Sequence, residues 1–162
     1  MSLLHESSGI FVGNPIGWLL RNVNSSLALF KDNGVRGFSK VLIAIRPGRR
    51  NKRFIDVADK ICLHFGASLT LLNIVSETDS NQKIKRTEKS STELISETKS
   101  KSVVKIIKSN SPVEAISEES ASYDLLILGT PEKDNWISVL FGAGEDRFVK
   151  KAACSVLRLT IK

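Results

Sequence analysis

A dense cationic cluster, made of Arg46, Arg49, Arg50, Lys52 and Arg53, is the part of the sequence whose residue types point most directly to ligand chemistry. Guanidinium and ammonium groups bind phosphate and carboxylate oxygens through charge-assisted hydrogen bonds. The cluster has three interpretations: a site for a phosphate-type ligand, a contact with the anionic inner face of a membrane, or a solvated loop without a ligand. The residues alone leave all three open.

The whole chain carries a net charge of +7 at pH 7, which raises the question of nucleic-acid binding. The sequence has no interleaved aromatic platform, no zinc-finger spacing and no helix-turn-helix pattern to accompany that charge. We therefore expect no nucleic-acid partner.

The residues that could bind a metal or act as nucleophiles are few and scattered. His5 and His64 lie far apart, and neither has a second ligand at metal-binding spacing. Cys62 lies on an apolar helix face and Cys154 opens a strand, so we expect buried free thiols in a reducing compartment. These patterns predict no metal site.

Catalytic residues are equally hard to find. No serine or cysteine stands in a nucleophile-elbow setting, and no pair of acids differs from ordinary surface charge. Glu145 and Asp146 begin a predicted helix, where acids stabilise the positive end of the helix dipole without doing chemistry. Trp136 is expected to be a lid or interface residue. We predict that the chain is not an enzyme.

Length and composition are those of one globular domain: 162 residues, 41% hydrophobic and 25% charged. No stretch approaches the roughly 20 apolar residues that span a bilayer. The best candidate, residues 10–20, is interrupted by Gly13, Asn14, Pro15 and Gly17. We expect a cytoplasmic location.

Alternating strand and helix patterns predict an α/β fold from residue 40 onward. The expected strands are short apolar runs at 41–45, 69–75, 103–107, 124–128 and 155–159. Between them we expect a helix capped by Asn51 and ended by Gly66, a helix over 113–122 with a capping box at Ser111 and Glu114, and a last helix that contains 148–152. The polar segment 76–102 predicts a loop followed by a weak surface helix at 92–99, or a flexible segment. This order gives an open, mostly parallel five-stranded sheet with helices on both faces.

The sequence also contains an internal repeat. An offset of 129 residues sets Gly13 on Gly142 and aligns residues 9–30 with residues 138–159, apolar on apolar and Ser26 on Ser155. Each copy reads as a glycine turn, a short amphipathic helix and a strand. We therefore divide the chain into residues 1–38, the helix-strand end of a preceding repeat plus a linker, and residues 39–162, a complete repeat.

From residue 40 onward the chain resembles the universal stress protein family. The resemblance rests on KVLIAI, ADKICLHFGASLTLLNIV, VEAISEESASYDLLILGT and FGAGEDRFVKKAACSVLRL, which occur in the right order with suitable gaps. It implies a Rossmann-like domain that dimerises, often through its last strand. Some members of the family bind ATP and others do not.

The family's nucleotide-binding members share a signature, Gly-x2-Gly-x9-Gly followed by Ser or Thr, in which backbone N–H groups approach phosphate oxygens. Here Gly129 and Gly142 occupy the first and third glycine positions. Glu132 replaces the second glycine, and Ala143 replaces the hydroxyl residue, although Gly144 keeps the turn flexible. The site is therefore degenerate.

A second departure lies at the end of the first strand, where ATP-binding members usually carry an aspartate and this chain carries Arg46. The resemblance thus implies no cofactor, or weak binding of ATP or another adenine nucleotide. The Glu132 carboxylate would repel the nucleotide's phosphates and weaken their binding by on the order of a few kcal/mol. Arg46, Arg49 and Arg50 remain candidates for binding a different anion at the start of the following helix.

The fragment before Lys40 resembles the end of a universal stress domain, with Gly13 at the third signature glycine and strand residues at 26–30. Tandem domains with such short linkers resemble the cytoplasmic C-terminal regions of cation/proton antiporters and amino-acid permeases, and soluble tandem stress proteins share the arrangement. The other interpretation of this fragment is an N-terminal extension of a single stress protein domain.

The leading strand has an expected place. A bare last strand exposes unpaired backbone groups, so residues 27–30 could lie beside residues 156–159 within one chain. The apolar face of the leading fragment also needs cover, which a homodimer through the last strand and this fragment would supply.

Two hypotheses for function follow. The first is a non-catalytic regulatory and dimerisation module of a membrane transporter, at the cytoplasmic face of the inner membrane, whose partner is the membrane-embedded transporter domain. The second is a soluble universal stress protein that binds a nucleotide.

Overall fold

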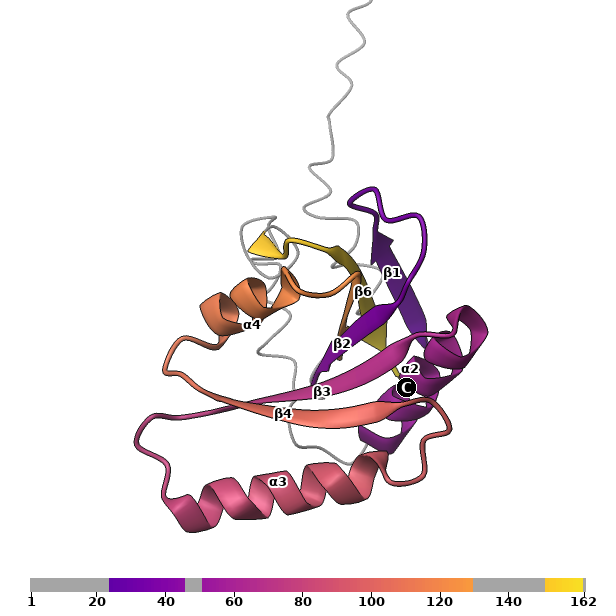
Figure 1. Cartoon of the computed structure of the whole chain (residues 1–162). Helices are drawn as coiled ribbons and strands as arrows, with labels where there is room; N and C mark the ends of the chain where they lie inside the picture. The colour runs from indigo at the N-terminus through magenta and orange to yellow at the C-terminus, as the bar shows by residue number, and fades with distance from the viewer. Residues whose placement is uncertain (1–23, 46–50, 130–150, 162) are drawn as a thin grey trace, which may run out of the picture.

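Six strands form one sheet in the computed structural model, which describes residues 24–45, 51–129 and 151–161. The strand order is β1-β6-β5-β2-β3-β4. Every neighbouring pair is parallel except β1 with β6. The elements are β1 (Leu27–Lys31), β2 (Lys40–Ala44), α2 (Asn51–Phe65), β3 (Ser68–Val75), α3 (Asn81–Ile95), β4 (Ser102–Lys108), α4 (Pro112–Ser120), β5 (Leu125–Gly129) and β6 (Ser155–Thr160) (Figure 1). The predicted mostly parallel α/β fold is confirmed.

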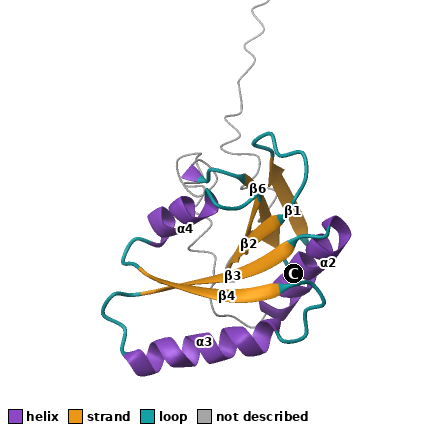
Figure 2. Ribbon diagram, in the orientation of Figure 1, coloured by secondary structure: helices purple, strands orange, loops and turns teal. Residues whose placement is uncertain are grey.

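Helices cover both faces of the sheet (Figure 2). The strand residues alternate between two apolar clusters, because successive side chains of a strand point to opposite faces. Val41 and Ile43 pack with residues of α2 on one face. Leu42 and Ala44 pack with Ile116 of α4 on the other face. Both faces of β2 are therefore buried, as its uninterrupted apolar run predicts.

Helix α2 ends as the sequence predicts. Gly66 has a φ of +66°, in the left-handed region that glycine enters most readily. The Ala67 N–H then donates to the Cys62 carbonyl at 2.8 Å. At the other end, Asn51 is the first residue of the helix itself.

The prediction for residues 76–102 was wrong about the helix. In place of a loop and a weak helix at 92–99, α3 begins at Asn81 and ends at Ile95. Ser80 caps it by accepting a hydrogen bond from the Lys83 N–H at 3.3 Å. The helix packs on the sheet partly through a polar contact, since buried Ser91 accepts a hydrogen bond from the Asn73 side chain of β3 at 2.9 Å.

The predicted capping box of α4 does not form. Ser111 is the N-cap residue, but its side chain makes no capping hydrogen bond. Pro112 occupies the first turn, where its missing N–H costs nothing. The helix therefore begins where expected, and Pro112 rather than the Ser111 hydroxyl marks its start.

The predicted pairing of the leading strand with the last strand is confirmed. Strand β1 is antiparallel to β6 and makes the sheet six-stranded instead of five-stranded. Leu29 lies opposite Arg158, and the predicted repeat, with its offset of 129 residues, would make these two positions equivalent. Leu27 pairs with Thr160, and Lys31 pairs with Val156. The same offset aligns Leu27 with Val156 and Lys31 with Thr160, so exchanging the two copies turns one pair into the other. The ladder thus has a local pseudo-two-fold axis at Leu29 and Arg158.

The connection from β1 to β2 is held against the rest of the sheet. The Asn33 N–H donates to Ser155 Oγ at 2.9 Å, and its side-chain amide donates to the Cys154 carbonyl at 2.8 Å. Phe38 packs edge-on against Phe65 with ring centroids 4.8 Å apart. The division of the chain at residues 38 and 39 stays a prediction.

Several sequence predictions fall outside the described residues. They include the short amphipathic helix expected before the leading strand (residues 18–23), Trp136, and the last helix apart from its end at Lys151. Within the described ranges, no helix has the length and apolar character needed to cross a membrane.

Candidate functional site

The carboxyl ends of β2 and β5 flank the point where the direction of the strand order reverses. From β2 the chain proceeds to β3 and β4 on one side and then returns to β5 and β6 on the other. In open parallel sheets, ligands bind in the crevice outside the carboxyl ends of strands at such a switch point. Ala44 is paired with Leu128, so the next residues, Ile45 and Gly129, lie at the switch point between the two strand ends.

Gly129 is tightly enclosed at the switch point. A Cβ atom at this position would lie 3.0 Å from Ile45 Cγ2 and 3.2 Å from Cζ of Phe54. Only a hydrogen fits there without displacing the β2 end or the α2 ring. The glycine therefore lets β5 end close against β2 and α2.

Gly129 is the one predicted site residue that the described structure places. Arg46, Gly142 and Gly144 lie outside the described residues. Arg46 follows Ile45 directly in the sequence. Lys52 and Arg53, also of the cationic cluster, belong to the first turn of α2, and Lys52 forms an ion pair with Glu97 at 2.5 Å.

A polar network at the carboxyl ends of β3 and β4 was missed by the sequence reasoning. Ser76 Oγ donates to Asn110 Oδ1 at 2.9 Å, and Asn110 Nδ2 donates to Glu77 Oε2 at 3.0 Å. The Ser76 N–H donates to Asp79 Oδ2 at 3.0 Å. A hydrogen bond from Lys83 lowers the pKa of Asp79. These groups satisfy one another, so they shape the loops beside the crevice.

A buried carboxylate fixes the connection between α3 and β4. Asp59 of α2 accepts hydrogen bonds from Ser100 Oγ at 2.6 Å and from the Ser100 and Lys99 N–H groups at 2.9 and 3.1 Å. Burial alone would raise the pKa of Asp59, but the hydrogen bonds lower it below its ordinary value. Asp59 is therefore a structural anion.

The two thiols are buried and unreactive in character. Burial, together with the smaller effect of the nearby Asp59 charge, raises the pKa of Cys62 to about 11. Burial also raises the pKa of Cys154. Both cysteines are free. Among the described residues, no group of His, Cys, Asp and Glu could hold a metal ion.

Comparison with known families decides what this fold is. The sequence model described as "Universal stress protein family" matches residues 37–159. This chain belongs to the universal stress protein family. No curated protein matches it.

Solved structures of universal stress proteins share the fold at low sequence identity. A universal stress protein from Archaeoglobus fulgidus DSM 4304 is 17% identical with a TM-score of 0.64, covering 88% of this chain and 52% of its own. Another Archaeoglobus fulgidus universal stress protein, in complex with dAMP, is 12% identical with a TM-score of 0.58, covering 75% of this chain and 97% of its own. A universal stress protein in complex with cAMP is 16% identical with a TM-score of 0.59, covering 78% of this chain and 98% of its own.

Proposed function

We propose that this chain is a non-catalytic regulatory and assembly module made of the end of one universal stress repeat and a complete second repeat. It would belong to the cytoplasmic region of a membrane transporter, a cation/proton antiporter or an amino-acid permease, at the inner face of the membrane. The tandem arrangement in this proposal rests on one observation, the register of β1 on β6. In that register Leu29 faces Arg158, the residue that the repeat aligns with it.

That register is what two copies of one domain produce when they pair through the same strand. A two-fold interface is isologous, so each residue near the axis faces its own equivalent. Chance pairing of two short strands has no reason to centre on equivalent positions.

Regulation in this proposal involves a degenerate nucleotide site at the carboxyl ends of β2 and β5. Two relatives were crystallised with dAMP and cAMP, so the fold accommodates adenine nucleotides. Gly129, the first glycine of the family signature, lies at this switch point, at the end of β5. Glu132 and Ala143 replace the second signature glycine and the hydroxyl donor, which weakens phosphate binding. An adenine nucleotide is therefore expected to bind weakly or not at all.

The partners proposed are the membrane-embedded transporter domain and a second copy of the chain. A homodimer through the last strand and the N-terminal fragment stays a prediction. Because β1 already pairs with β6, such a dimer would use the outer side of β1.

The second candidate is a soluble universal stress protein that binds a nucleotide. It is favoured by the position of Gly129 at the switch point and by the two relatives with bound nucleotides. Several membrane-spanning helices encoded upstream of residue 1 would decide for the transporter, and a short upstream stress repeat alone would decide for the soluble protein.

The deciding experiment is calorimetric titration of ATP with magnesium into the chain and into the triple variant Glu132→Gly, Ala143→Ser, Arg46→Asp. We expect little or no heat with the original chain and a measurable affinity with the triple variant. Micromolar binding by the original chain would move the nucleotide-binding stress protein to first place. Unchanged weak binding by the triple variant would contradict the account of why the site is degenerate.

A further inference from the structure

An apolar hollow of about 250 Å³ lies between β1 and the end of α2. Strand β1 contributes Phe30, which lies opposite Leu157 of β6 in the ladder. Helix α2 contributes Ile61 and Phe65. We call this hollow the phenylalanine pocket, and the described residues that line it are all apolar: Phe30, Phe38, Ile61, Phe65, Leu125 and Leu157. Gly129 is not among them, so the pocket is separate from the switch point.

Two of the rings that line the phenylalanine pocket are exposed. Phe30 has 53% of its surface exposed, and Phe65 has 48%. Among the described residues, the other exposed large apolar side chains are Leu63 and Val103. Phe38 packs edge-on against Phe65 with ring centroids 4.8 Å apart, which holds the Phe65 ring at the pocket. Apolar side chains that gather on an open surface, rather than standing singly, indicate an interaction site.

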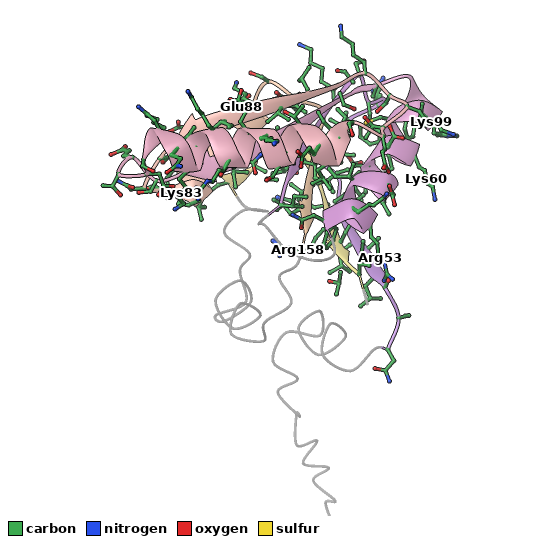
Figure 3. The ribbon with its side chains drawn as sticks, turned by 90° about the horizontal axis from the view of Figure 1, so that it is seen from below. Arg53, Lys60, Lys83, Glu88, Lys99 and Arg158 are labelled. Carbon is green, nitrogen blue, oxygen red and sulfur yellow. The ribbon has the colours of Figure 1, made fainter. Side chains whose placement is uncertain are left out.

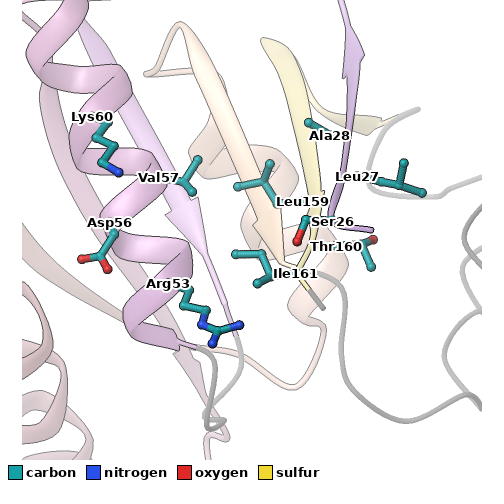
Figure 4. A pocket seen from close by; sticks show the side chains of 10 residues that line it. All are labelled: Ser26, Leu27, Ala28, Arg53, Asp56, Val57, Lys60, Leu159, Thr160 and Ile161. Atoms are coloured by element: carbon teal, nitrogen blue, oxygen red, sulfur yellow. The ribbon is translucent and has the colours of Figure 1, made fainter. Parts of the chain in front are cut away.

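The apolar surface continues along β6 into a second hollow (Figure 4). This hollow has a volume of about 490 Å³, and Leu159 and Ile161 project into it toward Val57 of α2. Val57 and Ile61 are one helical turn apart on α2, so they lie on one stripe of the helix. Leu157 and Leu159 lie on one face of β6, since side chains of a strand alternate. A partner on the phenylalanine pocket therefore has further apolar surface to cover.

The neighbouring helical surface is charged. Figure 3 shows side chains that project from α2, α3 and the connection after α3, namely Lys60, Lys83, Glu88 and Lys99. All four are exposed. An occupant of the phenylalanine pocket must therefore be apolar at the centre of its contact and polar around it. That is the usual anatomy of a protein–protein interface.

The size of the phenylalanine pocket favours one inserted side chain over a small-molecule ligand. Its volume of about 250 Å³ is below the range of about 300–1,000 Å³ that is typical of small-molecule sites. An apolar cavity of about 150 Å³ already holds a benzene ring. The pocket therefore has room for the phenyl ring of a phenylalanine.

We propose that this surface joins two copies of the chain, with Phe30 of each copy inserted into the phenylalanine pocket of the other. An interface with a two-fold axis must be self-complementary, and this one patch carries both an exposed phenyl ring and a pocket that fits one. Strand β1 is at the edge of the sheet, so a second copy reaches Phe30 without crossing another described strand. The inference rests on the homodimer of the proposed function and names the side chains that form it.

The first test is sedimentation of the full 162-residue chain over a series of concentrations. We expect a dimer whose dissociation constant rises at least tenfold with Phe30→Ser, because an aromatic anchor contributes most to an interface and is lost twice in a two-fold dimer. Val103→Ser is the matched control: it removes a side chain of similar exposure, 50%, from β4 at the other edge of the sheet, and it should leave the dimer unchanged.

Two outcomes of this test would overturn the inference, and they differ in what they say of the proposed function. Equal dimerisation of the original chain and of Phe30→Ser would exclude the Phe30 contact while the proposed homodimer stands. A chain that stays monomeric at every concentration would exclude the homodimer as well.

The second test mixes two variants. Phe30→Ser removes the inserted ring and keeps the pocket open, whereas Ile61→Trp keeps the ring and fills the pocket. Each variant alone should be monomeric where the original chain is dimeric, and an equal mixture should form a heterodimer through one ring and one open pocket. Leu63→Trp, at an exposed position of α2 that does not line the pocket, is the control and should dimerise like the original chain.

Circular dichroism establishes that each variant folds. A mixture that associates no more than its separate components would contradict the insertion of Phe30 into the partner's pocket. Loss of the dimer with Leu63→Trp would show that the contact lies on another face of α2 and would also overturn the inference.

Discussion

Leu29 and Arg158 lie opposite each other in the ladder between β1 and β6, and the predicted sequence repeat aligns the same two positions. The two residues differ in type although the ladder is symmetric about them. Arg158 is buried, with 3% of its surface exposed. If two β6 strands from two copies paired in the same register, Arg158 would face Arg158. Like charges directly opposite each other destabilise a strand pair, so Leu29 favours pairing of β6 with β1 over pairing of β6 with itself.

This difference predicts the assembly of a chain that lacks residues 1–31. Its β6 edge is exposed and available for pairing, yet two Arg158 guanidinium groups would meet at the two-fold axis. We expect the shortened chain to remain monomeric and the shortened chain with Arg158→Leu to dimerise, as measured by size-exclusion chromatography with light scattering. Arg158→Lys, which keeps the charge, is the control and should stay monomeric. Dimerisation of the shortened chain with Arg158 intact would contradict this explanation.

Gly129 offers a prediction about stability at the switch point. A methyl group there must displace Ile45 or the Phe54 ring, since its contacts would be 3.0–3.3 Å. Gly129→Ala should lower the free energy of unfolding by about 1–3 kcal/mol, measured by urea denaturation. Gly37→Ala is the matched control, because nothing lies within 4 Å of a Cβ there; it should stabilise the chain by about 0.4–1 kcal/mol. Equal effects of the two substitutions would show that Gly129 is not required by packing.

The strands could be predicted from the sequence because each is rich in apolar residues, and the continuous apolar runs of β2 and β5 are buried on both faces. The place of β1 could be predicted because the repeat makes it equivalent to β6. The start of α3 could not, since it depends on a capping bond that Ser80 accepts from the Lys83 N–H and on the buried contact of Ser91 with Asn73, which the fold brings together. The number of apolar residues in that segment gave no sign of either contact.

The candidate site likewise has one part that the sequence predicts and one part that depends on contacts made only in the folded chain. The topology alone places Gly129 at the switch point, since the order of strands and helices determines where the carboxyl ends of β2 and β5 meet. The network of Ser76 and Asn110 joins residues 34 positions apart through side-chain hydrogen bonds. Serine and asparagine after a strand are typical of any loop, so their types give no signal of mutual contact.

The cysteines give a prediction about reactivity. The thiolate is the reactive form of cysteine, and a pKa of about 11 leaves roughly one Cys62 thiol in a thousand ionised at pH 8. Cys62 and Cys154 are also buried. We expect neither thiol to react rapidly with Ellman's reagent in the native chain and both to react in guanidinium chloride. Rapid labelling of Cys62 in the native chain would contradict its burial.

Asp59 predicts how stability depends on pH. Its pKa in the folded chain lies below the ordinary aspartate value of 3.8, so its hydrogen bonds to Ser100 and Lys99 stabilise the fold above pH 3.8, and that contribution is lost as the pH falls through the lower, folded-state pKa. Asp59→Asn should therefore cost about 2 kcal/mol at pH 7, and the difference from the original chain should shrink below pH 3.8. The control Asp56→Asn removes an exposed carboxylate of the same helix and should change stability by less than about 0.5 kcal/mol. Urea denaturation at a series of pH values measures both. A cost of Asp59→Asn that stays constant down to the most acidic pH at which the chain folds would show that shape, and not the charge of Asp59, holds the connection between α3 and β4.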